Sequence, residues 1–386
     1  MPTPADRLYW KLSSFYLFFF ASVGAFVPYW GLYLKETGYS PAQIGELMAV
    51  VMATKIVAPN VWGWIADHFG HRTLIIRLGA LAALLCFAGV TLVGGYWWLA
   101  AVLATFSFFW HAVLPQFEAV TMTHLGDGTH RYSHIRLWGS VGFIIAVAAL
   151  APLFQAFGVM LLPWVVLLLL ALVLSSSFLV EDRALPATTA AAPGILRTLT
   201  SPAILWLMAA CFLMQASHGP YYTFLTIYLE GEGYSRSLVG QLWALGVIAE
   251  VGVFLMMHRW LPRFGAWPLL MTAIGITALR WVLIALYADV LPVLIFAQTL
   301  HAASYGLYHA SAIDLVHRLF PGRQQGRGQA LYSSMSFGLG GAVGSLMAGY
   351  AWTAFGGTGS YLAAAGLASF GLAAAWRGAR SDQARV

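Results

Sequence analysis

The sequence predicts an all-α membrane protein of twelve transmembrane helices, arranged as two parallel repeats of six. Three observations lead to this prediction. The composition is 60% hydrophobic and only 9% charged, whereas a soluble domain has about 25% charged residues. Long apolar runs recur from the start of the chain to its end. One segment of the first half also recurs, with substitutions, in the second half.

Each apolar run is close to the roughly 20 residues that a helix needs to cross a bilayer. Helices are favoured because lipid offers no partner for free backbone groups, and because the runs are too continuous for the alternating strands of a barrel. The first run is too long for a signal peptide and has no small-residue cleavage site. The predicted spans are 8–34, 44–65, 74–93, 97–122, 135–155, 159–180, 204–229, 239–260, 267–286, 290–320, 330–355 and 361–376.

The repeated segment relates the two halves. The stretch YLKETGYSPAQIGEL (33–47) returns 195 positions later as YLEGEGYSRSLVGQL (228–242), with 7 of 15 residues identical. Both copies follow the first span of a half, where Gly-Tyr-Ser marks a turn and Ser begins the next helix. Because each half has six spans, both copies cross the membrane in the same direction. We predict an N-terminal six-helix bundle over 1–180, a polar cytoplasmic linker over 181–201 and a C-terminal bundle over 202–386.

Positive charges gather at alternate connections and at the C-terminus. This positive-inside pattern predicts a multi-pass protein of the cell's inner (plasma) membrane with both termini in the cytoplasm. It also explains the net charge of +6 without a nucleic-acid partner. The opposite connections hold only Lys35 and Arg236, whereas the charged side carries Arg72, Arg77, Arg131, Arg183, Arg197, Arg259, Arg263, Arg318, Arg323, Arg327, Arg377, Arg380 and Arg385.

Ionisable residues inside the predicted spans are costly and usually mark a transport pathway or a proton site. They are Lys55, Glu118, Glu250, Arg280 and His301. Lys55 and Glu250 are also separated by 195 positions, so the two halves carry opposite charges at equivalent places. The simpler alternative is a structural ion pair or two snorkelling side chains.

Polar and aromatic residues recur at helical spacing in the first and fourth spans of each half. Such rows are often helix packing alone, but they also fit the walls of a shared site. The rows are Ser22, Phe26, Tyr29 and Tyr33; His111, Pro115 and Glu118; Gln215, His218 and Tyr222; and His301, Tyr305 and Tyr308.

The stretch GWIADHFGHR (63–72) resembles the signature of the major facilitator superfamily between its second and third helices. The residues that match are Gly63, Asp67, Gly70 and Arg72, while His68 and His71 stand where a basic residue is usual. The resemblance implies that Asp67 latches one conformation through charge and helix-dipole contacts. It also implies that two halves rock about a site near the midplane, lined by the first and fourth helices of each half. The alternative for Asp67 is an ordinary polar helix end.

Two further segments, PQFEAV (115–120) and HIRLWGSVGF (134–143), are similar to the lactose permease and its relatives. The resemblance implies that Glu118 and Arg136 bind substrate together, and that Arg280 and His301 belong to the proton-coupling network. Ser304 and Phe143 depart from that family's carboxylate and sugar-stacking Trp, so a galactoside is not expected. Position alone would make Arg136 a positive-inside residue near the end of its span.

Several segments resemble the phenylpropionate permease family more closely. They are QASHGPYY, GYSRSLVGQLWALGVIAEV, LRWVL, QTLHAAS and YHASA. This resemblance implies uptake of a small aromatic carboxylic acid with protons, with Arg136 or Arg280 holding the carboxylate and cavity aromatics packing the ring. Sugar or nucleoside symport is the second hypothesis, with Glu118 accepting hydroxyl hydrogen bonds, and drug efflux is the third. The candidate substrate-binding residues are Glu118, Arg136, Tyr29, His218, Tyr222 and Tyr305.

Glu250 is the first candidate for the coupled proton because Ser304 replaces the family carboxylate. His301 is the second, since imidazole titrates near neutral pH, and Arg280 and Lys55 complete the proposed coupling set. We expect no cofactor besides the proton gradient, and a monomer whose partners are a small substrate, protons and lipid. The sequence contains no zinc motif, nucleophile elbow or phosphate loop, so an enzyme is not expected.

Overall fold

The computed structural model describes residues 4–182 and 196–384, which form helices and short connections without any strand. This confirms the all-α fold class. The predicted linker falls largely on 183–195, outside the described residues. The first half contains α1 (Pro4–Glu36), α2 (Pro41–Phe69), α3 (Arg72–Ala88), α4 (Tyr96–Leu125), α5 (Tyr132–Phe157) and α6 (Leu162–Ser177).

The second half is more interrupted than the first. It begins with the short α7 (Leu196–Leu199), and a π-helical turn at Ala302–Leu307 separates α12 from α13. A second π-helical turn, Ser334–Gly340, separates α14 from α15. The other helices are α8 (Pro202–Ser217), α9 (Gly219–Gly231), α10 (Arg236–Phe264), α11 (Ala266–Tyr287), α12 (Leu291–Thr299), α13 (Tyr308–Leu319), α14 (Gln325–Ser333) and α15 (Gly341–Gln383).

Within the described ranges, ten helical segments are long and apolar enough to cross a membrane. The predicted span 290–320 is not among the ten, because a turn at Leu300 interrupts the helix between α12 and the segment that begins at His301. The segment Gln325–Gln383 counts once, although its backbone leaves helical geometry at Gly356 (φ 68°, ψ −171°). Ser360 then donates a hydrogen bond to the Ala348 carbonyl, twelve positions earlier, at 3.3 Å. The chain therefore reverses at Gly356, which is consistent with two passes in this segment and twelve in all.

The repeated sequence folds into the same turn twice. Gly38 and Gly233 both adopt a left-handed backbone, with φ of 94° and 89°, which glycine tolerates without strain. In each copy the Tyr amide that follows bonds the carbonyl five residues back at 3.1 Å. Ser40 and Ser235 then cap the next helix. We call the end of the molecule that carries these two turns the turn end.

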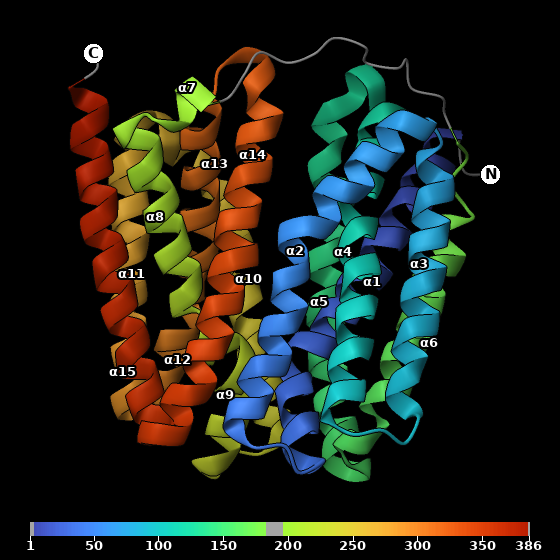
Figure 1. Cartoon of the computed structure of the whole chain (residues 1–386), viewed down its shortest axis with the longest axis vertical. Helices are drawn as coiled ribbons and strands as arrows, with labels where there is room; N and C mark the ends of the chain where they lie inside the picture. The colour runs from blue at the N-terminus through green and yellow to red at the C-terminus, as the bar shows by residue number, and fades with distance from the viewer. Residues whose placement is uncertain (1–3, 183–195, 385–386) are drawn as a thin grey trace.

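The helices lie in two groups, α1–α6 on one side and α8–α15 on the other (Figure 1). The groups contact each other chiefly through α2 against α15 and α5 against α10, with α1 also touching α9. The start of α1 and the end of α15 lie at the end opposite the turn end (Figure 1).

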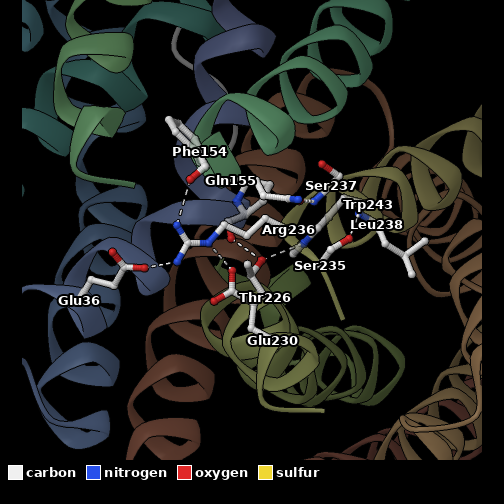
Figure 2. A network of polar contacts seen from close by, with 11 residues as sticks. Glu36, Phe154, Gln155, Thr226, Glu230, Ser235, Arg236, Ser237, Leu238 and Trp243 are labelled. Carbon is white, nitrogen blue, oxygen red and sulfur yellow. Dashed lines mark hydrogen bonds and ion pairs between the residues drawn. The ribbon is translucent and has the colours of Figure 1, made fainter. Parts of the chain in front are cut away.

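A polar network joins the two groups at the turn end (Figure 2). Arg236, the first residue of α10, pairs with Glu36 of α1 and donates to the Phe154 carbonyl of α5 at 3.1 Å. Its Nε also bonds Glu230, from its own half, at 2.7 Å. The Ser237 amide adds a bond to the Gln155 side chain at 3.1 Å. One guanidinium thus holds three segments of the fold together.

Candidate substrate site

A cavity of about 210 Å³ lies between the two helix groups. Charged residues from both halves reach it, namely Lys55 of α2, Arg136 of α5 and Glu250 of α10. Polar side chains include Ser140, Gln215, His218, His301 and Ser345. Its aromatic lining consists of Phe20, Phe143, Tyr222, Trp243, Tyr305 and Phe337. The site therefore combines three charges with rings on several sides.

Lys55 and Arg136 are the two cations of the cavity. Neither forms a hydrogen bond or an ion pair with another described residue. The Arg136 guanidinium instead lies over the Phe20 ring at 3.9 Å from its centroid, a cation–π contact. Charged donors attract an anion more strongly where the protein excludes part of the water. The first-half wall of the cavity is therefore suited to an anionic group.

Gly139 makes room for this arrangement. It follows Arg136 by three positions on α5, so the two lie on the same face of the helix. A Cβ at position 139 would lie 2.6 Å from Arg136 Nη1 and 2.7 Å from Phe20 Cδ2. Because it has no side chain, Gly139 lets the Arg136 guanidinium and the Phe20 ring pack closely against α5.

Glu250 and His301 face the cavity from the second half. Their side chains approach within 3.6 Å, from His301 Nε2 to Glu250 Oε2. His301 Nδ1 lies 3.1 Å from Arg280 Nη1. Because arginine only donates, Nδ1 must accept this bond, and the neutral imidazole then carries its proton on Nε2, facing Glu250. A continuous polar chain therefore runs from Arg280 through His301 to the cavity carboxylate.

Arg280 itself lies outside the cavity lining and is completely buried. Its donors are taken by the Ala297 carbonyl at 2.9 Å, Gln298 at 3.0 Å and Ser304 at 2.8 Å. Ser304, where the resemblance to the lactose permease family implied a carboxylate, thus accepts a hydrogen bond from Arg280. Since four of its five N–H donors are occupied, Arg280 supports His301 rather than offering a free guanidinium for a substrate carboxylate, which was one of the two options that the sequence left open.

Glu118 and Arg136 are not in direct contact. Glu118 is outside the cavity lining and accepts a hydrogen bond from Tyr132 at 3.3 Å. No ion pair between Glu118 and Arg136 occurs among the described residues. Tyr16 lies near both residues: its ring contacts Tyr132, the partner of Glu118, and its centroid lies 5.9 Å from the Arg136 guanidinium. Joint substrate binding by the two residues stays a prediction.

The four aromatic and imidazole candidates divide into two sets. His218, Tyr222 and Tyr305 line the cavity, and His218 stacks on Tyr222 with centroids 5.6 Å apart. Tyr29 lies outside the lining, where its hydroxyl donates to the Val147 carbonyl at 2.8 Å and its ring packs on Phe154. Tyr29 therefore joins α1 to α5.

The signature residues come together away from the cavity. Asp67 forms an ion pair with Arg72, and Arg72 also donates to Gln116 of α4 at 2.6 Å. Gly70 ends α2 in a left-handed conformation with φ of 72°. Gly63 lies on the same helix, facing Gln116. The contacts fix the α2–α3 turn against α4, and their role as a conformational latch stays a prediction.

The sequence also contained a signal for cavity residues that were missed. Met52 and Val247 line the cavity and, like Lys55 and Glu250, are separated by 195 positions. They lie three residues before the charged pair, on the same helix faces. By contrast, no pattern marked Phe20, Trp243 or Phe337, which reach the cavity through the packing of distant helices.

Trp243 connects the cavity to the turn end. Its indole N–H donates to the Thr226 hydroxyl at 3.2 Å, and this hydroxyl donates to the Pro28 carbonyl of α1 at 2.5 Å. Figure 2 shows Trp243 and Thr226 beside the Arg236 network. A cavity side chain is therefore linked by two hydrogen bonds to the interface between the halves.

Comparison with known proteins agrees with this architecture. The chain is 31% identical over 355 residues to the probable 3-phenylpropionic acid transporter of Escherichia coli (strain K12), covering 88% of this chain and 90% of that protein. It is 28% identical over 346 residues to the maltose permease of Geobacillus stearothermophilus, covering 87% and 86%.

Among solved structures, a mutant form of the nucleoside transporter NupG superposes with a TM-score of 0.86 at 16% identity, covering 96% of this chain and 99% of that one. At that identity the similarity shows the fold alone. The sequence model of the MFS_1 like family matches residues 9–363. The chain therefore belongs to the MFS_1 like family and is a multi-pass membrane transporter of the major facilitator type, not an enzyme.

Proposed function

We propose that the protein takes up a small aromatic carboxylic acid, similar to 3-phenylpropionate, together with protons by alternating access. The observation that carries the proposal is a pair of cations, Lys55 and Arg136, that have no hydrogen-bond or ion-pair partner among the described residues and lie in a cavity lined with aromatic rings. An arylalkanoate matches both features, because its carboxylate suits the cations and its ring suits the apolar walls. The identity to the probable 3-phenylpropionic acid transporter supports the same substrate class.

In this mechanism Arg136 binds the carboxylate through two N–H donors, since its planar fork matches the two oxygens. Lys55 adds a second positive charge. The substrate ring then packs among Phe20, Phe143 and Tyr222, which line the same space. Offset and edge contacts between such rings favour an aromatic ligand over an aliphatic one.

Proton coupling is assigned to Glu250, with His301 beside it. A monovalent anion that enters with one proton leaves the net charge of the cavity unchanged, so the loaded carrier crosses its midpoint without an added charge in lipid. When the proton leaves Glu250, the free carboxylate competes with the substrate for Lys55 and Arg136. Release of the proton thus promotes release of the substrate.

The remaining assignments are part of the same proposal. The asymmetry of arginines supports a cytoplasmic position for both termini and an external position for the turn end, in the inner membrane. The protein works as a monomer and needs no cofactor besides the proton gradient.

Sugar or nucleoside symport is the second candidate, supported by the identity to the maltose permease. With Glu250 protonated, a neutral polyol would leave Lys55 and Arg136 without a counter-charge, whereas an acid supplies one. Glu118, which would accept sugar hydroxyls, lies outside the cavity lining. The aromatic acid is therefore preferred.

Binding of radiolabelled ligands to the purified protein tests the choice. We expect 3-phenylpropionate to bind, and maltose and uridine to compete poorly. Arg136→Gln should weaken binding of the acid at least tenfold, while Arg259→Gln, on the exposed end of α10, serves as the matched control. Strong binding of maltose or uridine, unaffected by Arg136→Gln, would replace the acid with a neutral substrate.

A further inference from the structure

Two buried polar atoms in residues of the cavity wall have no hydrogen-bond partner within 4–182 and 196–384. They are Nε2 of Gln215 and Nε2 of His218, in side chains that are 3% and 1% exposed. Both residues line the cavity, and they lie three positions apart at the end of α8. Other unpaired buried atoms of the described residues, such as the indole nitrogens of Trp30 and Trp110, belong to side chains outside the lining.

The chemistry of the two atoms is complementary. His218 Nδ1 lies 2.8 Å from the Met214 carbonyl, so Nδ1 must donate to it. In the neutral imidazole Nε2 is then a free acceptor. Gln215 Nε2 is an amide nitrogen and a free donor. A buried acceptor and a buried donor left unpaired are destabilising, and each calls for an explanation.

Rings on two sides fix the direction of the His218 imidazole. It stacks on Tyr222 at 5.6 Å and meets the edge of Trp281 at 5.0 Å. The bond to Met214 holds the same ring at its other nitrogen. Nε2 is therefore a positioned acceptor, which is the arrangement that gives a site its selectivity.

We propose that the transported acid carries a hydroxyl group at the end opposite its carboxylate, and that Gln215 and His218 recognise this hydroxyl. A hydroxyl donates one hydrogen bond and accepts another, so it satisfies His218 Nε2 and Gln215 Nε2 together. Lys55 and Arg136 lie on the first-half wall and these two residues on the second-half wall. The ligand class is thus a hydroxylated arylalkanoic acid that spans the cavity.

This inference rests on the proposed function, because the carboxylate orients the ligand. It goes beyond that function in naming a polar group that an unsubstituted 3-phenylpropionate lacks. Sites built to bond a hydroxyl reject analogues that leave their polar atoms unpaired.

The test compares three ligands on the purified full-length protein by calorimetry: 3-phenylpropionate, 3-(4-hydroxyphenyl)propionate and its methyl ether. The ether oxygen accepts a hydrogen bond but cannot donate one. We expect the phenol to bind about tenfold more tightly than the unsubstituted acid, and the ether to lose this advantage. The 3-hydroxy isomer is measured in parallel to locate the hydroxyl on the ring.

The variant His218→Phe keeps a ring of similar shape and removes the acceptor. The ratio of the phenol and phenylpropionate affinities should fall to about one, and Gln215→Leu should lower it by a smaller factor. His258→Phe, an exposed histidine on α10, is the matched control and should keep the ratio of the parent.

Equal binding of phenol and unsubstituted acid by the parent protein would overturn the inference while leaving the proposed function intact. An unchanged ratio in both His218→Phe and Gln215→Leu would do the same. Failure of all the acids to bind would instead remove the proposed function. The ligand comparison is made on the parent protein, so it distinguishes these outcomes even where a variant folds poorly.

Discussion

Arg236 of α10 pairs with Glu36 of α1, and this contact joins the two halves of the protein at the turn end (Figure 2). The same guanidinium bonds the Phe154 carbonyl, also across the interface, and Glu230 within its own half. If the halves separate at this end, Arg236 loses its two cross-half partners and keeps Glu230. Arg236 would therefore keep one carboxylate partner, Glu230, and would not be left as an unpaired, partly buried charge.

Arg236→Gln is expected to loosen the turn end, because it removes the charge that holds Glu36. A cysteine introduced at Val27, which lines the cavity, should then react faster with an impermeant maleimide added from the turn-end side. We expect a severalfold increase in labelling rate in membranes, since hydrogen bonds between charged groups are the stronger ones at such interfaces. Arg259→Gln provides the matched control.

Glu36→Gln should have the same effect to a smaller extent, because Arg236 still bonds Phe154. Glu230→Gln leaves the Glu36 pair in place and should change labelling least. An equal rate in the parent, Arg236→Gln and Glu36→Gln would show that other contacts, such as the one from Thr226 to the Pro28 carbonyl, hold this end without them.

Arg280 is expected to be essential for the packing of the second half. It is completely buried, and its donors satisfy acceptors on α12 and on the π-helical turn. Arg280→Lys keeps the charge, but one ammonium cannot reach the same spread of acceptors. A buried acceptor that is left without its donor costs about 1–3 kcal/mol. Scanning fluorimetry should show a lower melting temperature for Arg280→Lys than for Arg259→Lys.

A melting temperature for Arg280→Lys within error of the parent would mean that the network is not a stability element.

Local sequence was sufficient for the helices and the repeated turn. The turns at Gly38 and Gly233 depend on residues next to each other in the chain, so a pattern of Gly-Tyr-Ser identifies them. The 195-residue offset also predicted that Lys55 and Glu250 occupy equivalent places, and the structure brings both to one cavity with His301. Such features follow from spacing along one helix and from internal symmetry.

Other features depend on contacts between distant segments. Arg236 meets Glu36 across 200 positions and Phe154 across 82, and no periodicity connects them. Glu118 has suitable helical spacing, but it lies outside the cavity lining, where it accepts a hydrogen bond from Tyr132. The π-helical turn after His301 likewise arises where an extra residue enters the helix, which hydropathy does not reveal. These features could be identified only from the structure.

Arg136→Lys separates charge from geometry at the proposed carboxylate site. The lysine keeps a cation but loses the planar fork and the stacking on Phe20. We expect the affinity for 3-phenylpropionate to fall about tenfold or more by calorimetry. Glu118→Gln should change affinity less, because Glu118 contacts Tyr132 rather than the cavity. Unchanged affinity in both variants would show that Arg136 and Glu118 do not bind substrate and serve only membrane topology and helix packing.

Glu250→Gln tests the assignment of the coupled proton, because the amide mimics a permanently protonated carboxylate of nearly equal size. Glu250 lines the same cavity as Lys55 and lies 3.6 Å from His301. The variant should still bind the acid and exchange it across the membrane, since the two halves can rock while the side chain at position 250 is neutral. It should not accumulate the acid against a gradient, because no proton is released inside. Counterflow and proton-driven uptake, measured on the same proteoliposomes, separate these two activities. Normal accumulation by Glu250→Gln, with loss of accumulation in His301→Gln, would move the proton site to His301.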